Sequence, residues 1–246
     1  MSKITIIIIG IIVLCFGGLV TWSIISSQSK PTTNFDDYDS TSIIPPSDSN
    51  GQIGDHVRGN ADSPVVFVEY ADFQCPGCAS IQPSISTLFE EYKDHVAFVF
   101  RNFPISGHQN ARAAASAAGA AGLQGYFFEM ADTLFSNQAV WIYASGGNRT
   151  DVFIDLFRKA APNGDVNKFR TDMASPEISK KINFDYDLGV KKDKVTGTPT
   201  FLINGERIDI TATTSMAILD LMREKLNAKL AEFNIIVSPN TDVDSD

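Results

Sequence analysis

The chain has 246 residues, of which 43% are hydrophobic and 20% are charged, and its formal net charge is −9. This length allows one large domain with appended segments and is too short for two domains of ordinary size. The composition is that of a globular protein with a filled core. A surface that binds nucleic acid needs clustered Lys and Arg to neutralise phosphates, and the sequence has no run of them. We therefore expect no nucleic-acid partner.

Residues 1–25 are predicted to form a membrane anchor. The stretch from Ile4 to Ile25 is uncharged, apolar and long enough to span a hydrocarbon core. It is longer than the apolar part of a cleaved signal peptide and lacks a small-x-small cleavage site. Lys3 precedes the stretch, and aspartates follow the next positive charge, Lys30. The positive-inside rule therefore predicts a single-pass protein of the cell membrane, with a cytoplasmic N-terminus and an extracytoplasmic remainder.

Two further segments are predicted to lie outside the globular core. Residues 26–54 are rich in Ser, Asp, Pro and Thr, which predicts a flexible extracytoplasmic linker with no core of its own. Residues 233–246 are assigned to an acidic tail. The globular domain is therefore expected to occupy residues 55–232.

The first part of this domain is predicted to be strand, helix, strand. Residues 64–70 and 96–100 are apolar, β-branched runs that are typical of buried strands. Between them, apolar side chains recur at three- and four-residue steps from Pro76 onward, which predicts a helix with one apolar face. Pro83 is expected to kink that helix.

The second part is predicted to be helical and to end in a hairpin and a helix. Helical patterning extends over about 109–190. An Asn-Gly pair joins two predicted strands, 200–203 and 206–210, and is a strong signal for a tight hairpin. A last helix is predicted at about 214–231. The order β-α-β, helical block, β-β-α indicates an α/β fold in which helices cover one sheet.

Two of the chain's three cysteines, Cys75 and Cys78, are separated by two residues. Such a pair belongs to a metal site, a structural staple or a redox centre. Structural zinc needs four ligands. The other candidate ligands are scattered singly, one of them in the predicted anchor: Cys15, His56, His95 and His108. A disulfide that closes so short a loop contributes little stability. We therefore expect no metal site and favour a redox centre.

The expected position of Cys75 at the start of a helix supports this interpretation. Pro76 suits the first helical turn, where its missing N–H is not needed. The helix dipole and the unpaired N–H groups of that turn stabilise a thiolate on Cys75. Cys78, one turn further along, is expected to be shielded and to attack a mixed disulfide formed at Cys75.

Three stretches resemble the DsbA-like thiol:disulfide oxidoreductases of the thioredoxin superfamily, in particular the membrane-anchored bacterial kind. They are SPVVFVEYADFQCPGC (63–78), FVFRNFPISGHQNARAAASAAGAAG (98–122) and GVKKDKVTGTPTFLINGERI (189–208). With the helices between and after them, the resemblance covers about residues 55–232. It implies a thioredoxin-like fold with a central mixed sheet and a helical subdomain, inserted at about 109–190, that overhangs the active site.

The resemblance also implies roles for individual residues. Cys75 takes the place of the exposed nucleophile and Cys78 that of the resolving cysteine. The family's cis-proline falls on Pro199, beside the cysteines, and the backbone of Thr198 is expected to pair with an extended substrate chain. Glu69 takes the place of a buried acid that accepts and returns the proton of Cys78. The alternative for Glu69 is a solvated residue on an edge strand.

The two residues between the cysteines differ from those of the best-known relatives. Pro76 and Gly77 stand where the strongly oxidising periplasmic prototype has Pro-His and reducing thioredoxins have Gly-Pro. These positions tune thiolate stability and hence the reduction potential, so the direction of net electron flow is left open. The role of His108 is open too, between a functional residue and a hydrogen-bonded loop histidine.

We predict an enzyme that donates its Cys75–Cys78 disulfide to exported proteins and has no cofactor besides that disulfide. The implied partners are exported polypeptides with cysteine thiols and a membrane partner of the quinone-linked type that re-oxidises the pair. The alternatives are a disulfide reductase or isomerase on the same fold, and a non-catalytic membrane-anchored chaperone or binding module.

Overall fold

The computed structural model describes residues 33–210 and 214–237. The anchor predicted at 1–25, the first residues of the predicted linker and most of the predicted tail lie outside these ranges. No helix within the described residues is long and apolar enough to cross a membrane. The compact unit that contains the two neighbouring cysteines begins at Phe35.

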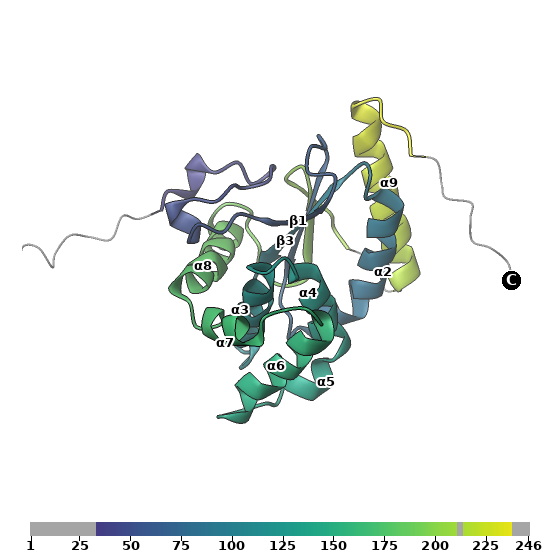
Figure 1. The fold of residues 1–246 in the computed structure, drawn as a ribbon. Coiled ribbons are helices and arrows are strands. Elements are labelled where there is room, and N and C mark those ends of the chain that lie inside the picture. The colour runs from purple at the N-terminus through teal and green to yellow at the C-terminus, as the bar shows by residue number, and fades with distance from the viewer. Residues whose placement is uncertain (1–32, 211–213, 238–246) are drawn as a thin grey trace, which may run out of the picture. The chain divides into compact units, whose positions relative to one another are not determined.

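A five-stranded mixed sheet lies at the centre of this unit (Figure 1). In the order in which they lie side by side, its strands are β1 (His56–Gly59), β3 (Ala97–Asn102), β2 (Val66–Ala71), β4 (Thr200–Ile203) and β5 (Glu206–Arg207). β2 and β3 are parallel, and all other neighbours are antiparallel. Every residue of β2 and β3 is buried, which fits their largely apolar sequences.

Helices cover both faces of the sheet. They are α2 (Pro76–Tyr92), α3 (Ala111–Gly122), α4 (Phe127–Ser136), α5 (Gln138–Trp141), α6 (Asn148–Ala160), α7 (Val166–Asp172), α8 (Pro176–Lys191) and α9 (Ser215–Glu232). α2 is the crossover that parallel β2 and β3 require, and α9 lies beside it (Figure 1). This pair covers the face that carries Phe67 and Phe201. α8 lies on the other side, where Gly189 closely approaches the ring of Tyr70.

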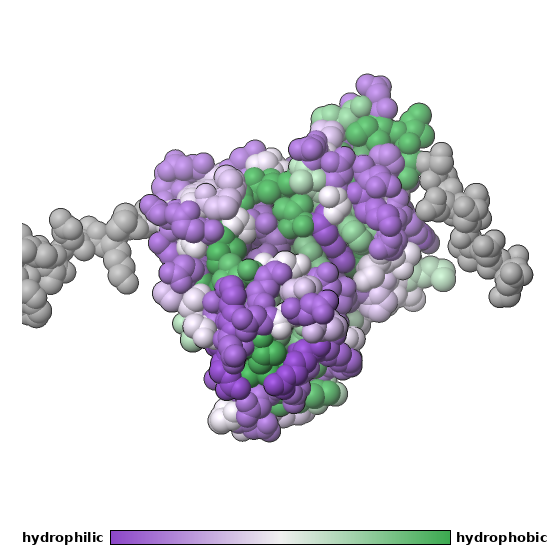
Figure 2. Space-filling view, viewed as in Figure 1, coloured by the Kyte–Doolittle hydropathy of each residue, from purple (hydrophilic) through white to green (hydrophobic). Residues whose placement is uncertain are grey.

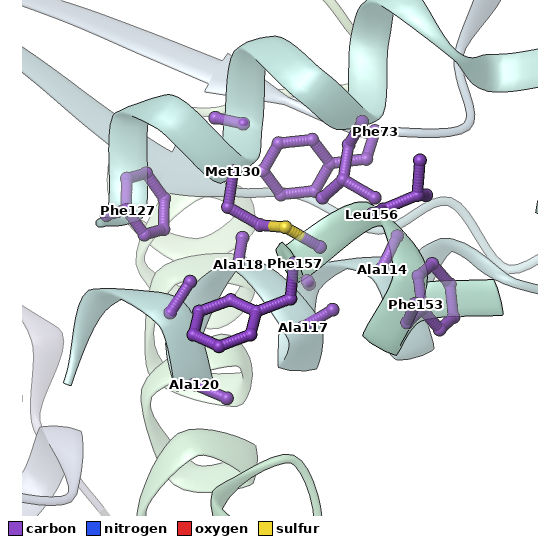
Figure 3. Packing of buried hydrophobic residues seen from close by; sticks show 14 of the residues in the cluster. Phe73, Ala114, Ala117, Ala118, Ala120, Phe127, Met130, Phe153, Leu156 and Phe157 are labelled. Carbon is purple, nitrogen blue, oxygen red and sulfur yellow. The ribbon is translucent and has the colours of Figure 1, made fainter. Parts of the chain in front are cut away.

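The block from α3 to α7 has its own apolar core (Figure 3). Met130 of α4 and Phe157 of α6 lie against the alanines of α3, whose small side chains let the neighbouring helices pack closely. This core continues to the sheet through Phe73, whose ring lies 5.0 Å from that of Phe100 and 5.0 Å from that of Phe135, between centroids. The helical block is therefore packed directly on the chain that leads into the cysteine motif.

The predicted order of elements is confirmed, with two differences in the sheet. β1 was not predicted, because its four residues are only partly buried and contain no apolar run. The strand predicted at 206–210 pairs only over Glu206 and Arg207. Ile208 keeps one backbone hydrogen bond to β4, and the chain then packs against the apolar cluster that includes α9 instead of extending the sheet.

The prediction of a flexible linker at 26–54 is wrong for residues 35–54. Two 3-10 turns form there, at Phe35–Asp37 and Asp48–Asn50, and the segment lies beside α8 (Figure 1). Phe35 and Ile44 are buried against Phe184 and Leu188 of α8. The polar composition of the segment concealed these few apolar anchors, which are enough to hold it on the domain.

A group of buried charges joins this segment to the sheet. Arg101 of β3 forms an ion pair with Asp55 at 2.8 Å, and Lys181 of α8 contacts Asp55 at 3.0 Å and Asp185 at 2.7 Å. All four side chains are at most 2% exposed. The guanidinium of Arg101 also donates hydrogen bonds to two carbonyl oxygens of the segment, those of residues 40 and 42, each at 3.0 Å.

Candidate active site

The two cysteines lie at the N-terminal end of α2, directly after the loop that leaves β2. Cys75 is the N-cap residue and Pro76 is the first residue of the helix, as the sequence predicts. Cys75 is 8% exposed and Cys78 is fully buried. Both are free cysteines in the structure. The arrangement gives one sulfur limited access to solvent and shields the other.

The surroundings of Cys75 favour its thiolate. A hydrogen bond from the thiol of Cys78 is the largest influence on the pKa of Cys75 and lowers it, whereas burial raises it. The side chain of Thr198 and the backbone N–H groups of Gly77 and Cys78 add to the stabilisation, so the pKa of Cys75 is lowered to about 5. At neutral pH the reduced form therefore carries a thiolate at Cys75.

The surroundings of Cys78 have the opposite effect. Burial raises the pKa of Cys78, and its hydrogen bond to Cys75 raises it further. The negative charges of Cys75 and Glu69 act in the same direction. Cys78 is therefore held as a neutral thiol while Cys75 is ionised, which is the division of roles between a resolving cysteine and a nucleophile.

Thr198 and Pro199 lie beside the motif although they follow it by more than a hundred residues. The Thr198–Pro199 peptide bond is cis. The carbonyl oxygen of Thr198 lies 3.5 Å from Cys75 Sγ and accepts a hydrogen bond from it only while Cys75 holds its proton. A Cβ atom at Gly77 would lie 3.5 Å from Cδ of Pro199 and 3.7 Å from Cys75 Sγ, so the proline ring borders the helical turn between the cysteines.

Glu69 is buried in the middle of the sheet. It lies on β2, between Phe100 of β3 and Phe201 of β4, and is 5% exposed. This position excludes the alternative of a solvated residue on an edge strand. Burial raises the pKa of Glu69 to about 7; the charge of Arg58 opposes this rise, and that of Asp132 adds to it. The carboxyl group therefore exchanges a proton near neutral pH.

A small cavity lies beside Glu69, between β1, α2 and α4. Its volume is about 20 Å³, and Arg58, Glu69 and Gln82 line it together with apolar side chains. This is room for about one water molecule. Gln82 donates a hydrogen bond to Asp132 at 3.4 Å, and both residues also line a wider cavity of about 370 Å³ between α2 and α4. These groups mark a polar route from Glu69 toward the surface.

The structure adds residues that the sequence did not indicate. Gln138 at the start of α5 donates hydrogen bonds to the carbonyl oxygens of Phe73 at 2.7 Å and Cys75 at 3.1 Å. Asp72, just before the motif, contacts the ring of His108 at 2.7 Å. His108 is thus a hydrogen-bonded loop residue. No local pattern marks Gln138, because only the packing of the helical block brings it to the motif.

Among residues 33–210 and 214–237, no group of three or more His, Cys, Asp or Glu side chains is placed to hold a metal ion.

A comparison of sequences identifies the family. The family described as Thioredoxin matches residues 51–220. The chain belongs to the thioredoxin family. A curated relative, the Na(+)/H(+) antiporter NhaA 3 of Salinispora tropica, is 39% identical over 155 residues, which are 62% of this chain and 22% of the antiporter. NhaA 1 of Salinispora arenicola is 36% identical over 154 residues, again 22% of its length. The chain thus spans less than a quarter of these relatives.

Solved structures have the same fold. A thioredoxin-like oxidoreductase from Silicibacter pomeroyi is 26% identical, with a TM-score of 0.54 over 70% of this chain and 92% of that one. BdbD from Bacillus subtilis is 22% identical, with a TM-score of 0.60 over 77% and 98%. The thiol-disulfide exchange protein alpha-DsbA2 from Wolbachia pipientis is 22% identical, with a TM-score of 0.55 over 70% and 86%. The predicted DsbA-like, thioredoxin-like fold is confirmed, and the family supports thiol–disulfide oxidoreductase chemistry.

Proposed function

We propose that this protein catalyses disulfide formation in exported polypeptides by donating a disulfide between Cys75 and Cys78. The observation that carries the proposal is the opposite effect of the site on the two thiols. The pKa of Cys75 is lowered to about 5, whereas that of Cys78 is raised. One sulfur is therefore a good leaving group at neutral pH and the other holds its proton, as dithiol–disulfide exchange requires.

The first step forms a mixed disulfide. A thiolate of the substrate attacks Sγ of Cys75 in the oxidised pair. The new bond joins the substrate sulfur to Cys75, the Cys75–Cys78 bond breaks, and Cys78 leaves as a thiolate. Because Cys78 is buried, this thiolate takes up a proton, and Glu69 with its pKa of about 7 is the nearby buried acid that we propose as the donor.

The second step releases the product. The second thiolate of the substrate attacks the substrate sulfur of the mixed disulfide, and Cys75 leaves as a thiolate. Two electrons have then moved from the substrate to the cysteine pair, and the substrate holds one new disulfide. The low pKa of Cys75 favours this release, since a thiol of low pKa leaves faster.

The bordering residues are proposed to position the substrate. Thr198 presents its backbone beside Cys75, and an extended substrate chain can pair with it as an added strand. Pro199 borders the first turn of α2 at Gly77. Gly77 has no side chain, and it stabilises the Cys75 thiolate through its backbone N–H.

The direction of electron flow is argued from the same thiolate. Groups that stabilise the thiolate of Cys75 stabilise the reduced form, which makes the disulfide a stronger oxidant. This supports oxidation of substrates over their reduction. Disulfide donation is useful where exported proteins fold, and the apolar stretch from Ile4 to Ile25 supports a location at the cell membrane with the domain outside the cytoplasm.

Each cycle leaves the pair reduced, so the proposal includes a re-oxidising partner. A membrane protein of the quinone-linked type would accept the two electrons from Cys75 and Cys78 and restore their disulfide. The predicted N-terminal anchor would hold the domain on the same membrane as this partner. Reporter fusions on either side of residues 4–25 test the topology, and a cytoplasmic C-terminal reporter contradicts it.

The proposal is tested with the full chain in detergent micelles. The reduction potential is measured by equilibration with glutathione, together with the rate of disulfide formation in a reduced two-cysteine test protein. We expect an oxidising potential and a rate that is lost in Cys75→Ser and kept in the matched control Cys15→Ser. A potential near that of reducing thioredoxins, about −270 mV, favours the reductase alternative. Cells whose exported proteins form disulfides normally with Cys75→Ser favour the non-catalytic chaperone.

A further inference from the structure

A second cavity lies in the helical block, lined by residues of α3, α6, α7 and α8 and by none of the cysteine motif. Its volume is about 400 Å³. Three arginines line it, one from each of three helices: Arg112 of α3, Arg149 of α6 and Arg170 of α7. No carboxylate is among the lining residues. Three guanidinium groups around one cavity are not expected from the composition, because the chain as a whole carries a net charge of −9.

The three guanidinium groups are incompletely neutralised. Arg112 donates a hydrogen bond to the side-chain oxygen of Asn183, and Arg149 donates to that of Asn110 at 3.5 Å; both acceptors are uncharged. Arg170 has an ion pair with Asp151, which is long at 3.7 Å and exposed. Counting this carboxylate, the group keeps a charge of about +2, which attracts a dianion.

The backbone around the cavity adds to this attraction. Arg149 and Thr150 belong to the first turn of α6, a helix of 13 residues whose N-cap, Gly147, provides no side-chain hydrogen bond. The N–H groups of this turn carry the positive end of the helix dipole. The hydroxyl groups of Thr150 and Ser116 also line the cavity and are further donors for an oxyanion.

The rest of the lining is apolar. Phe153, Met173 and Ile182 contribute to it, together with Ala113. Figure 2 shows apolar surface bordered by strongly hydrophilic side chains in the region of α6 and α7. A cavity of about 400 Å³ is larger than an inorganic anion needs, so its apolar lining has room for an organic group bonded to the anion.

We propose that this cavity binds a phosphate monoester through Arg112, Arg149 and Arg170, with the organic part of the ester on the apolar lining. The guanidinium fork matches the oxygens of phosphate in pairs. A phosphate monoester carries a charge close to −2 at neutral pH, which neutralises the net positive charge of the three arginines and Asp151. The ester is either a soluble small molecule or the headgroup of a phosphomonoester lipid, and both present the same chemistry. The proposal does not rest on the exchange reaction.

Isothermal titration of the full chain in nonionic detergent micelles tests the proposal with defined probes. They are phenyl phosphate, inorganic phosphate, benzyl alcohol and short-chain dihexanoyl phosphatidic acid. We expect saturable binding of phenyl phosphate, weaker binding of inorganic phosphate and none of benzyl alcohol. Binding is expected to weaken at high salt, because ionic contacts at an open cavity are screened. It is also expected to persist in Cys75→Ser, which separates it from the proposed redox function.

Charge-neutral variants locate the site. Arg149→Gln and Arg170→Gln are each expected to weaken phenyl phosphate binding by about tenfold or more, because each removes a charge-assisted hydrogen bond. The matched control is Arg158→Gln, on the same helix α6 but paired with Asp155, and it is expected to leave affinity within about twofold. Since these arginines are exposed, the variants are expected to fold normally, which thermal unfolding without ligand checks.

The outcomes are distinct. Phosphatidic acid that binds more tightly than phenyl phosphate, with the same loss in Arg149→Gln, identifies a lipid headgroup as the source, and the reverse order identifies a soluble ester. The proposal is overturned by an absence of saturable binding up to about 10 mM phenyl phosphate. It is overturned equally if Arg158→Gln weakens binding as much as Arg149→Gln does, or if inorganic phosphate binds as tightly as the ester.

Discussion

The ring of His108 lies 2.7 Å from the carboxylate of Asp72, measured from Nδ1 to Oδ2. The same carboxylate accepts hydrogen bonds from the backbone N–H groups of Ile105 at 2.8 Å and Gln74 at 2.7 Å. The carbonyl oxygen of Asp72 accepts the N–H of Cys75 at 3.0 Å. Asp72 thus joins the loop after β3 to the loop that leads into α2, and its hydrogen bonds fix the position of Cys75.

Replacing this carboxylate is expected to destabilise the domain. Asp72→Ala removes an acceptor for two backbone N–H groups, and we expect a loss of about 2–4 kcal/mol in the free energy of unfolding. His108→Ala is expected to lose about 1 kcal/mol or less, because its ring is 27% exposed and solvent can replace it as a partner. Urea unfolding measures both. Equal losses in the two variants would show that Asp72 acts mainly through His108 and not through the loop backbone.

The core of the candidate site follows from local sequence. Cys75, Pro76 and Cys78 form a contiguous motif after an apolar run, so helix-start chemistry can be derived without any tertiary information. Pro199 was found only through the resemblance, because a proline before a strand has no local signal that it lies beside a cysteine. Glu69 was found in the same way, and the structure then explains its altered pKa by burial on a central strand.

Other parts of the structure depend on contacts that are distant in sequence. Gln138 contacts Cys75 across 63 positions, and Asp132 approaches Gln82 across 50. Neither pair has a pattern that sequence periodicity detects, because periodicity marks apolar side chains, and Gln138, Gln82 and Asp132 are polar. The segment 35–54 was assigned to a linker for a related reason. Its few anchoring side chains are spread among polar residues, and its buried backbone is satisfied by Arg101 from another element.

Glu69 is expected to make stability fall with rising pH. Burial raises its pKa in the folded protein to about 7, whereas a glutamate in an unfolded chain titrates near 4.3. Between these values the folded state keeps a proton that the unfolded state has lost, so the stabilisation present below pH 4 is lost as pH rises through about 7. Glu69→Gln has no such proton to lose. As pH rises from 4 to 8, we expect the free energy of unfolding of the variant to increase by about 3 kcal/mol relative to that of the original protein.

Urea unfolding at pH 4, 6 and 8 measures this difference. The matched control is Glu177→Gln, which makes the same change on an exposed residue of α8 and is expected to alter stability by less than about 0.5 kcal/mol at every pH. A constant difference between Glu69→Gln and the original protein over this range would mean that Glu69 does not titrate with a raised pKa in the folded state.

The same group is expected to affect the rate of mixed-disulfide formation. Below pH 7 the protonated Glu69 can give its proton to Cys78 as that sulfur leaves, whereas above pH 7 it cannot. Glutamine keeps the shape but has no acidic proton. The ratio of the single-turnover rate of the original protein to that of Glu69→Gln is therefore expected to fall by about tenfold between pH 6 and 8. Using the ratio removes the effect of substrate ionisation, and a flat ratio excludes the proton transfer.

Thr198 is expected to tune the thiolate of Cys75. Its side chain is among the groups that lower the pKa of Cys75 to about 5, and its buried hydroxyl has no hydrogen-bond partner of standard geometry within the described residues, so it is available to the thiolate. Thr198→Val keeps the shape and removes the hydroxyl. A hydrogen bond to a charged group contributes about 1.5 kcal/mol or more, so the pKa of Cys75 is expected to rise by about one unit and the reduction potential to fall by about 30 mV.

Thiolate absorbance at 240 nm against pH measures the first change, and equilibration with glutathione measures the second. Thr200→Val is the control, since the Thr200 hydroxyl donates a hydrogen bond to the carbonyl oxygen of Gly197 and not to the cysteine. A Cys75 pKa that is unchanged in Thr198→Val would mean that Cys78 and the backbone N–H groups stabilise the thiolate without this side chain.

Arg101 is expected to be essential for holding residues 35–54 on the domain. Although burial pushes the pKa of Asp55 upward, the charges of Arg101 and Lys181 keep it below its ordinary value, so Asp55 is a buried carboxylate that depends on both partners. Within the described residues, Arg101→Met leaves Asp55 with Lys181 as its one charged partner, beside the backbone N–H of Ile44, and leaves two carbonyl oxygens of the segment without their donor. Breaking a buried ion pair from one side costs about 3–5 kcal/mol.

Arg223→Met removes an ion pair with Glu91 that is partly exposed, and is expected to cost about 1 kcal/mol or less. Urea unfolding compares the two variants, and limited proteolysis is expected to cut within residues 35–54 only in Arg101→Met. Equal stabilities for the two variants, with the segment protected in both, would show that the apolar contacts of Phe35 and Ile44 hold it without the buried charges.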